Sequence, residues 1–196
     1  MGIAPGGVPL AYEVARALDA PLEAWAARQI HAPHTHAEHV GAIAEDGHRA
    51  FSLEAAPAAT RTLPHEHIRA LAEAEHEALL ESTHHIRNHP RTSMRNHTIL
   101  LVDDGIATGA TLRAAVRAIR QEKPHRVVAA VAVVARGALE NVDRWVDDVV
   151  FLHECDEPAD MTHWYAELHP VEDAVVAHLL DLRRQEMGAH TGSRHQ

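Results

Sequence analysis

The sequence predicts an α/β domain built on an open, parallel sheet flanked by helices. Two apolar runs, residues 98–102 and 126–135, have the β-branched composition of strands that are covered on both faces. Helical patterns separate these runs from each other and from a third run at 149–152, and strands that alternate with helices form parallel sheets. With 196 residues, 46% of them hydrophobic, we expect one domain over residues 1–187 and a disordered tail at 188–196.

The first elements follow a regular order. The opening residues predict the end of a short strand, a turn at Gly6 and Gly7, and a helix over residues 9–18 with apolar residues four positions apart. A second strand is expected over residues 22–30, where apolar and polar residues alternate loosely.

A hairpin and a long helix are predicted next. Residues 40–51 contain Asp46-Gly47, a dipeptide typical of a tight turn between two strands. Residues 64–88 carry a modest apolar stripe among many Glu and His residues, and Pro90 ends the helix that this stripe predicts. The polar face of this helix would be solvated or form a dimer contact, and a homodimer is the assembly we expect.

Three shorter helices complete the pattern. The first, over residues 112–120, and the second, over 137–145, connect the three apolar runs. The third, over 171–186, is expected to close the fold.

The first buried run ends in a segment rich in hydrogen-bonding groups. Asp103 and Asp104 follow the strand directly, so both carboxylates are expected at the carboxyl end of the sheet, where open α/β sheets bind ligands. Gly105 and Gly109 can adopt positive φ and let backbone N–H groups converge in front of the next helix, whose N-terminus favours anions. The segment is expected to bind a phosphate.

Two chemistries meet in this segment. Carboxylates accept hydrogen bonds from sugar hydroxyls, whereas the loop N–H groups and the hydroxyls of Thr108 and Thr111 donate to a phosphate. The pattern lacks the lysine of a P-loop and the spacing of the G-x-G-x-x-G dinucleotide fingerprint. A ribose 5-phosphate is the ligand that needs both halves.

Residues 101–111, Leu-Val-Asp-Asp-Gly-Ile-Ala-Thr-Gly-Ala-Thr, resemble the motif with which type I phosphoribosyltransferases bind phosphoribosyl pyrophosphate (PRPP). The resemblance implies an open parallel sheet with a small C-terminal hood. It also implies an enzyme that transfers ribose 5-phosphate from PRPP to an acceptor, expected to be a nucleobase, with release of pyrophosphate. Asp103 and Asp104 would act in catalysis by binding the ribose 2′- and 3′-hydroxyls, and Mg²⁺ would be carried by PRPP. The implied residues around the 5′-phosphate are Gly105, Ile106, Ala107, Thr108, Gly109, Ala110 and Thr111.

The turn at Gly6 and Gly7 resembles the pyrophosphate loop of a family branch with the pattern Pro-Arg-Gly-Gly-Val-Pro, although Pro5 occupies the place of the arginine. Both glycines are implied to bind PRPP, with a plain turn as the alternative. The second strand ends in Arg28-Gln29 where the branch has Arg-Lys, so Arg28 is the implied catalytic cation and the lysine is missing. We therefore expect catalysis to be weaker than binding. The alternative function is a non-catalytic regulatory protein that binds PRPP or a nucleotide.

Two features bear on the acceptor. Trp164-Tyr165 matches a C-terminal feature of the same branch and implies base binding, with a simple aromatic core pair as the alternative. Family members that use 6-oxopurines carry an aspartate where Ala107 stands, so the motif resembles more closely the orotate, adenine or uracil types. The acceptor itself cannot be deduced from the sequence.

Histidines gather in one segment of the chain. His31, His34, His36 and His39 invite a metal-site interpretation, because imidazole is a common ligand of transition metals. However, the chain has 19 histidines, spread throughout its length. We therefore predict no protein metal site and expect this segment to cover the substrate.

Composition limits the partners and the location. A net charge of −10 without a cluster of Lys or Arg argues against a nucleic-acid partner. The chain has one cysteine, Cys155, and no signal peptide or apolar run long enough to cross a bilayer, which predicts a cytoplasmic protein without a membrane partner. The expected partners are PRPP and a small acceptor.

Overall fold

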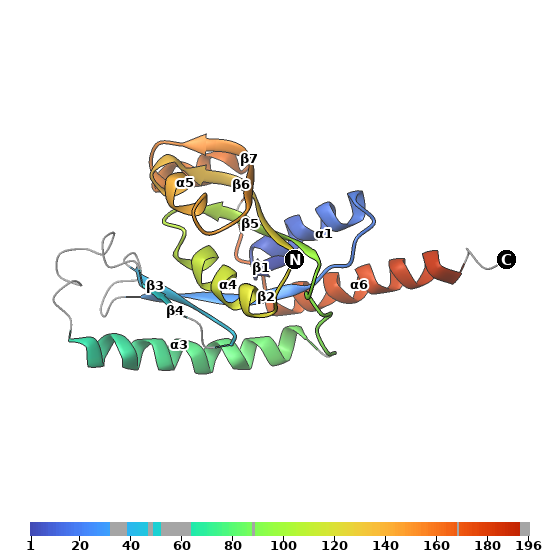
Figure 1. The fold of residues 1–196 in the computed structure, drawn as a ribbon, viewed down its shortest axis with the longest axis horizontal. Coiled ribbons are helices and arrows are strands. Elements are labelled where there is room, and N and C mark those ends of the chain that lie inside the picture. Colours follow the sequence, from blue (N-terminus) through green and yellow to red (C-terminus); the bar gives the residue numbers. More distant parts are fainter. Residues whose placement is uncertain (32–38, 47–48, 52–63, 88, 168, 193–196) are drawn as a thin grey trace.

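The computed structural model describes residues 1–31, 39–46, 49–51, 64–87, 89–167 and 169–192. These residues build one seven-stranded sheet in the order β4-β3-β2-β1-β5-β6-β7, with helices on both faces (Figure 1). The strands are β1 (Gly2–Ala4), β2 (Ala24–His31), β3 (His39–Ala44), β4 (Arg49–Phe51), β5 (Thr98–Ile106), β6 (Arg126–Ala135) and β7 (Asp148–Cys155).

The sheet is mostly parallel, which confirms the predicted fold class. The strands β2, β1, β5, β6 and β7 run parallel to one another, while β3 and β4 add an antiparallel edge. The carboxyl ends of β1, β2 and β5 therefore meet at one edge of the sheet. In the described part of the chain, β3 and β4 form the antiparallel pair expected of a hairpin, but the predicted turn residue Gly47 lies outside the described residues.

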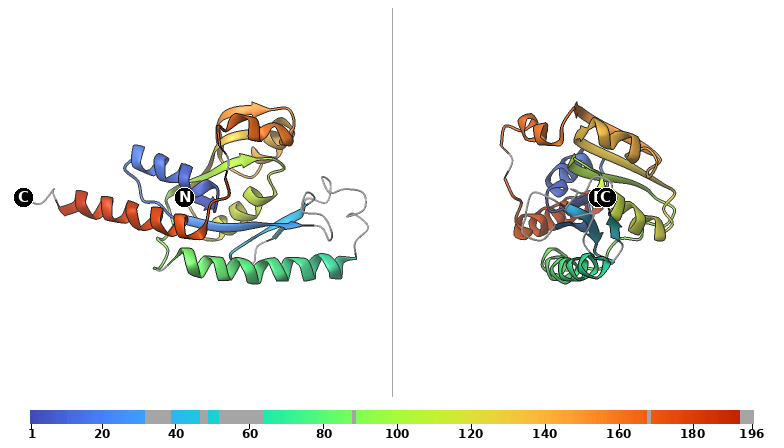
Figure 2. Two further views of the ribbon diagram at one scale, coloured as in Figure 1. Left: turned by 180° about the vertical axis from the view of Figure 1, so that it is seen from behind. Right: turned by 90° about the vertical axis from the view of Figure 1, so that its left-hand side faces the viewer.

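The helices are α1 (Gly7–Ala17), α3 (His65–Ile86), α4 (Ala110–Gln121), α5 (Arg136–Val142) and α6 (Asp173–Gly192), with a short 3₁₀ helix η1 (Pro158–Trp164). Alternate residues of β2 feed two separate cores. Trp25 and Ala27 pack with α4 and α5 on one face, whereas Ala24 and Ala26 pack with α1, α3 and α6 on the other. The three layers are visible in Figure 2.

Most element boundaries agree with the sequence, but β5 is longer than predicted. Thr98–Ile106 forms one strand, so Asp103 and Asp104 lie within its last residues instead of after its end. The β6 partners extend the ladder to Ile106, which shows that neighbouring strands override the low β-propensity of Asp and Gly. The bend to α4 is reduced to residues 107–109.

Two further differences concern the glycines and the C-terminus. Among the described glycines, positive φ occurs at Gly109, at 78°, and not at Gly105 as predicted. The helix α6 continues to Gly192, five residues into the segment predicted as a disordered tail, and residues 193–196 lie outside the described part. None of the described helices is long and apolar enough to cross a membrane.

Candidate functional site

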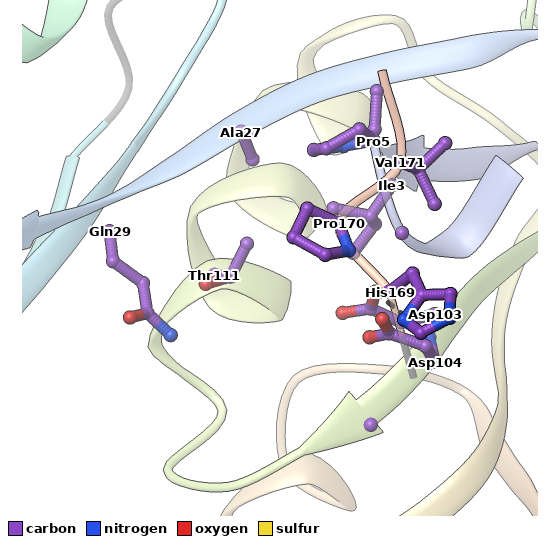
Figure 3. A pocket seen from close by; sticks show the side chains of 13 residues that line it. Ile3, Pro5, Ala27, Gln29, Asp103, Asp104, Thr111, His169, Pro170 and Val171 are labelled. Carbon is purple, nitrogen blue, oxygen red and sulfur yellow. Dashed lines mark hydrogen bonds between the residues drawn. The ribbon is translucent and has the colours of Figure 1, made fainter. Parts of the chain in front are cut away.

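A pocket of about 460 Å³ opens at the carboxyl end of β1 and β5 (Figure 3). Its walls come from β1 and the loop after it, from β2, from β5, from the first turn of α4 and from the segment before α6. Parallel sheets place ligand sites at this edge. The lining residues are Ile3, Ala4, Pro5, Gly6, Ala27, Gln29, Asp103, Asp104, Gly105, Thr111, His169, Pro170 and Val171.

Asp103 and Asp104, here called the acidic pair, form the polar centre of the pocket. Asp103 is only 8% exposed, and its Oδ1 accepts a hydrogen bond of 3.1 Å from the backbone N–H of Asp104. Burial raises the pKa of the Asp103 carboxyl well above its ordinary value of 3.8, and the nearby charge of Asp104 raises it further. The structure therefore holds two carboxyl groups together with little positive charge to offset them, an arrangement that favours a ligand able to donate hydrogen bonds.

The predicted glycine turn packs directly against the acidic pair. A Cβ atom on Gly6 would lie 2.3 Å from Oδ2 of Asp104, and one on Gly7 would lie 2.4 Å from the carbonyl oxygen of Val102. A side chain at Gly7 would meet backbone atoms of β5, whereas one at Gly6 would displace the Asp104 carboxylate. The structure thus brings together two of the predicted segments, which are about a hundred residues apart in the chain.

Only some residues of the segment 105–111 line the pocket. Gly105 and Thr111 line it, and Gly109 caps α4 in the left-handed conformation. The Ile106 and Ala110 side chains are buried in the core, so any contact they make with a ligand is through the backbone. Ala107 and Thr108 belong to the bend before α4, and Oγ1 of Thr108 accepts a hydrogen bond of 3.4 Å from the backbone N–H of Ala110.

The structure does not bring Arg28, the predicted catalytic cation, to the pocket. Successive residues of a strand point to opposite faces. Gln29 lines the pocket, whereas Arg28 lies on the face that carries α3 and pairs with Glu75 at 3.4 Å. Gln29, which stands where the family branch has lysine, lines the pocket together with Ala27 and is the polar β2 residue of the lining.

The predicted base-binding pair, Trp164 and Tyr165, also lies outside the pocket lining. The Trp164 ring stacks on His153 of β7, with ring centroids 4.1 Å apart and an angle of 17° between the planes. Tyr165 contacts β5 instead, where its hydroxyl donates a hydrogen bond to the backbone carbonyl of Asp104.

Three residues that the sequence did not predict complete the pocket instead: His169, Pro170 and Val171. They line the pocket from the segment before α6 (Figure 3). The available sequence signal was only their position between the Trp164-Tyr165 feature and the last helix, because no residue type among them specifies a ligand.

The histidine prediction remains without a structural test, because His34 and His36 lie outside the described residues. Within the described part of the chain, no cluster of three or more His, Cys, Asp or Glu residues could hold a metal ion. Oxygen ligands suit Mg²⁺, which commonly binds through one or two carboxylates and substrate phosphates. The acidic pair fits that mode of binding.

The family of the chain follows from comparison with known proteins. Residues 1–170 match the family model described as a phosphoribosyl transferase domain, a span that includes the glycine turn and the acidic pair. The chain belongs to the phosphoribosyltransferase family.

Individual members of the phosphoribosyltransferase family agree with this assignment. Two relatives in Mycobacterium tuberculosis, strains CDC 1551 and H37Rv, carry the name "Putative phosphoribosyl transferase" and are 32% identical over 156 residues, which is 78% of this chain and 34% of each relative. The chain therefore spans about a third of the length of these relatives. The crystal structure of TT1426 from Thermus thermophilus matches with a TM-score of 0.70 and 31% identity, over 91% of this chain and 84% of that one.

Proposed function

We propose that this member of the phosphoribosyltransferase family binds PRPP in the pocket and transfers its ribose 5-phosphate to a small acceptor, with release of pyrophosphate. The proposal rests above all on the position of the acidic pair, which shares a pocket of about 460 Å³ with the first turn of α4. A sugar phosphate needs hydrogen-bond acceptors and an anion site side by side. The pocket offers both.

The acidic pair supports the ribose half of this proposal. Both carboxylates line the pocket, and the raised pKa of Asp103 reflects a buried acceptor that lacks a cationic partner. Two vicinal hydroxyls donate hydrogen bonds to such a pair without adding charge. We assign the ribose 2′- and 3′-hydroxyls to Asp103 and Asp104.

The start of α4 supports the phosphate half. Gly109 at φ 78° turns the chain into a 12-residue helix, whose first N–H groups are free of helical partners and attract anions. Thr111 adds a hydroxyl that lines the pocket. The 5′-phosphate would lie against residues 107–111.

The part of the pocket that would bind pyrophosphate has fewer groups able to hold an anion. Among the described residues that line the pocket there is no Lys or Arg, and Gln29 and Pro5 stand where the family branch has cations. Mg²⁺ carried by PRPP would offset part of the negative charge that develops on the leaving pyrophosphate. The chain itself would contribute the N–H groups of the glycine turn.

This scarcity of cations favours a second candidate function, a regulatory protein that binds PRPP without turning it over. In that case the ribose and phosphate contacts would serve recognition alone. The acceptor distinguishes the two candidates, because only a transferase needs one.

Turnover with a panel of bases tests the proposed function. The protein would be incubated with PRPP, Mg²⁺ and adenine, uracil, orotate or hypoxanthine, and released pyrophosphate would be measured. We expect release with one of the first three bases and none with hypoxanthine, because Ala107 offers no proton acceptor to a 6-oxopurine. PRPP binding without pyrophosphate release with any base would instead support the regulatory candidate.

Adding a cationic side chain where the pocket would bind pyrophosphate should increase the rate of pyrophosphate release. Gln29→Lys places a charge at a residue that lines the pocket, and we expect pyrophosphate release to rise roughly tenfold, since loss of one preorganised donor typically lowers rates by about 10²–10³ and an introduced donor is less well placed. Addition of Pro5→Arg should increase the rate further. The matched control is Gln121→Lys, which makes the same change at the exposed far end of α4 and should leave the rate unchanged. A wild-type rate already in the ordinary range of about 1–10³ s⁻¹ would contradict the idea of a depleted site.

A further inference from the structure

The described residues between β7 and α6, 156–167 and 169–172, are here called the hood, and they cross the carboxyl end of β5 at two points. The methyl carbon of Met161 fills the space next to Gly105, where an added Cβ would lie 2.1 Å from it. Tyr165 donates its hydroxyl hydrogen bond to the carbonyl oxygen of Asp104. Four residues after Tyr165, the hood reaches the pocket at His169. The hood is thus attached to the strand residues that form the site.

Tyr165 is itself fixed by its surroundings. Its ring packs against a small core formed by residues of β6 and β7, and its backbone N–H donates to the carbonyl oxygen of Thr162 at 3.2 Å. Burial raises the pKa of the Tyr165 hydroxyl to about 12, with smaller contributions from the charges of Asp104 and Asp103. The hydroxyl therefore remains protonated, and able to donate, at any ordinary pH.

Contacts from outside the β5–β6 pairing hold Asp104 on two sides. The pairing between β5 and β6 includes Asp103 and Gly105 but omits Asp104. On its other side, Asp104 is confined by the glycine turn, because Oδ2 lies 2.3 Å from the place of a Cβ on Gly6. The glycine turn limits the position of the Asp104 side chain, and the Tyr165 hydrogen bond fixes its backbone carbonyl.

We infer that Tyr165 is a positioning residue that fixes the Asp104 peptide, so that the Asp104 carboxylate faces the ribose hydroxyls. This inference rests on the proposed function. It replaces the base-stacking role that the sequence implied for Tyr165 with an action through Asp104. Tyr165 itself has no contact with the substrate in this arrangement.

The two tyrosines of the chain provide a matched test. Tyr165→Phe removes only the hydroxyl that reaches Asp104, and Tyr12→Phe removes the hydroxyl that donates to Oε1 of Glu186 at 2.9 Å, away from the pocket. Affinities for PRPP, ribose 5-phosphate and inorganic pyrophosphate would be measured by calorimetry. We expect Tyr165→Phe to weaken binding of the two ribose ligands about three- to tenfold and to leave pyrophosphate binding unchanged. The upper limit is set by the single neutral hydrogen bond that fixes the Asp104 peptide, because the effect on the ligand is indirect. Tyr12→Phe should leave all three affinities unchanged.

Each other outcome is decisive. Wild-type affinity of Tyr165→Phe for ribose 5-phosphate would overturn the positioning role, and an equal loss for all three ligands would show a general disturbance of the fold instead. If the wild-type protein bound ribose 5-phosphate but not PRPP, the proposed transferase function would fail while the ribose 5-phosphate measurement still decided the role of Tyr165. If the wild-type protein bound neither PRPP nor ribose 5-phosphate, both the proposed function and the positioning role of Tyr165 would be overturned.

Discussion

Replacing both members of the acidic pair, Asp103→Asn with Asp104→Asn, should weaken PRPP binding by about a hundredfold or more. Each hydrogen bond to a charged acceptor is worth about 1.5–3 kcal/mol, and about 1.4 kcal/mol corresponds to a factor of ten in affinity. Calorimetric titration with PRPP and Mg²⁺ measures the change. The control is Asp148→Asn, which alters an exposed carboxylate on β7 that pairs with Arg126.

Asp103→Asn on its own should not destabilise the ligand-free protein. The pKa of Asp103 is raised in the folded state, so the native protein holds a proton more tightly than the unfolded chain, and stability falls as the pH rises above the ordinary value of 3.8 toward the raised pKa. Asp103→Asn removes the buried charge, and the asparagine oxygen can still accept from the N–H of Asp104. We expect the melting temperature of Asp103→Asn to equal or exceed that of wild type at pH 7 and to vary less with pH. Unchanged PRPP binding by the double variant would refute the ribose assignment.

Gly7→Ala should destabilise the fold itself. The added Cβ would lie 2.4 Å from the Val102 carbonyl oxygen and 2.9 Å from the Asp103 Cα atom, both of which are backbone atoms of a central strand. Overpacking of this kind costs about 1–3 kcal/mol, which corresponds to a fall of roughly 2–12 °C in the melting temperature of a domain of this size. Thermal unfolding of the ligand-free protein measures the change.

Two other glycines serve as comparisons for Gly7. Gly137, near the start of α5, has no heavy atom within 4 Å of its added Cβ, so Gly137→Ala should be neutral or slightly stabilising. At Gly6 the added Cβ would meet the Asp104 side chain instead of backbone, so Gly6→Ala should lower PRPP affinity more than stability. If Gly7→Ala melted like Gly137→Ala, the close packing of the glycine turn on β5 would be wrong.

The sequence predicted those parts of the fold in which composition and topology agree. β6 spans residues 126–135 as expected, because a continuous run of Val and Ala is covered on both faces. The acidic pair lies at the carboxyl end of the sheet as predicted, because parallel strands present their carboxyl ends at one edge, and there it lines the pocket. The extension of β5 to Ile106 could not be predicted, because it depends on β6 as a partner and not on the residues Asp103–Gly105 themselves.

The pocket lining differs from the expected site residues where a single position decides on which face of the sheet a side chain lies. Arg28 and Gln29 are neighbours on a strand, and a shift of one residue moves a side chain to the opposite face. The resemblance to the family branch implied Arg28, but the strand places Arg28 on the face that carries α3 and Gln29 in the lining of the pocket. The place of His169 in the pocket lining could not be predicted from the sequence either, because it depends on the path of the hood over β5.

The most direct test of the account is the effect of PRPP with Mg²⁺ on thermal unfolding. A ligand that binds only the native state stabilises it by about 2.7 kcal/mol at a hundred times its dissociation constant, which corresponds to a rise of roughly 5–11 °C for a domain of this size. We predict that rise for the wild-type chain at millimolar PRPP and its loss when Asp103 and Asp104 are both replaced by asparagine. An unchanged wild-type melting temperature across that range would contradict the claim that the pocket binds PRPP.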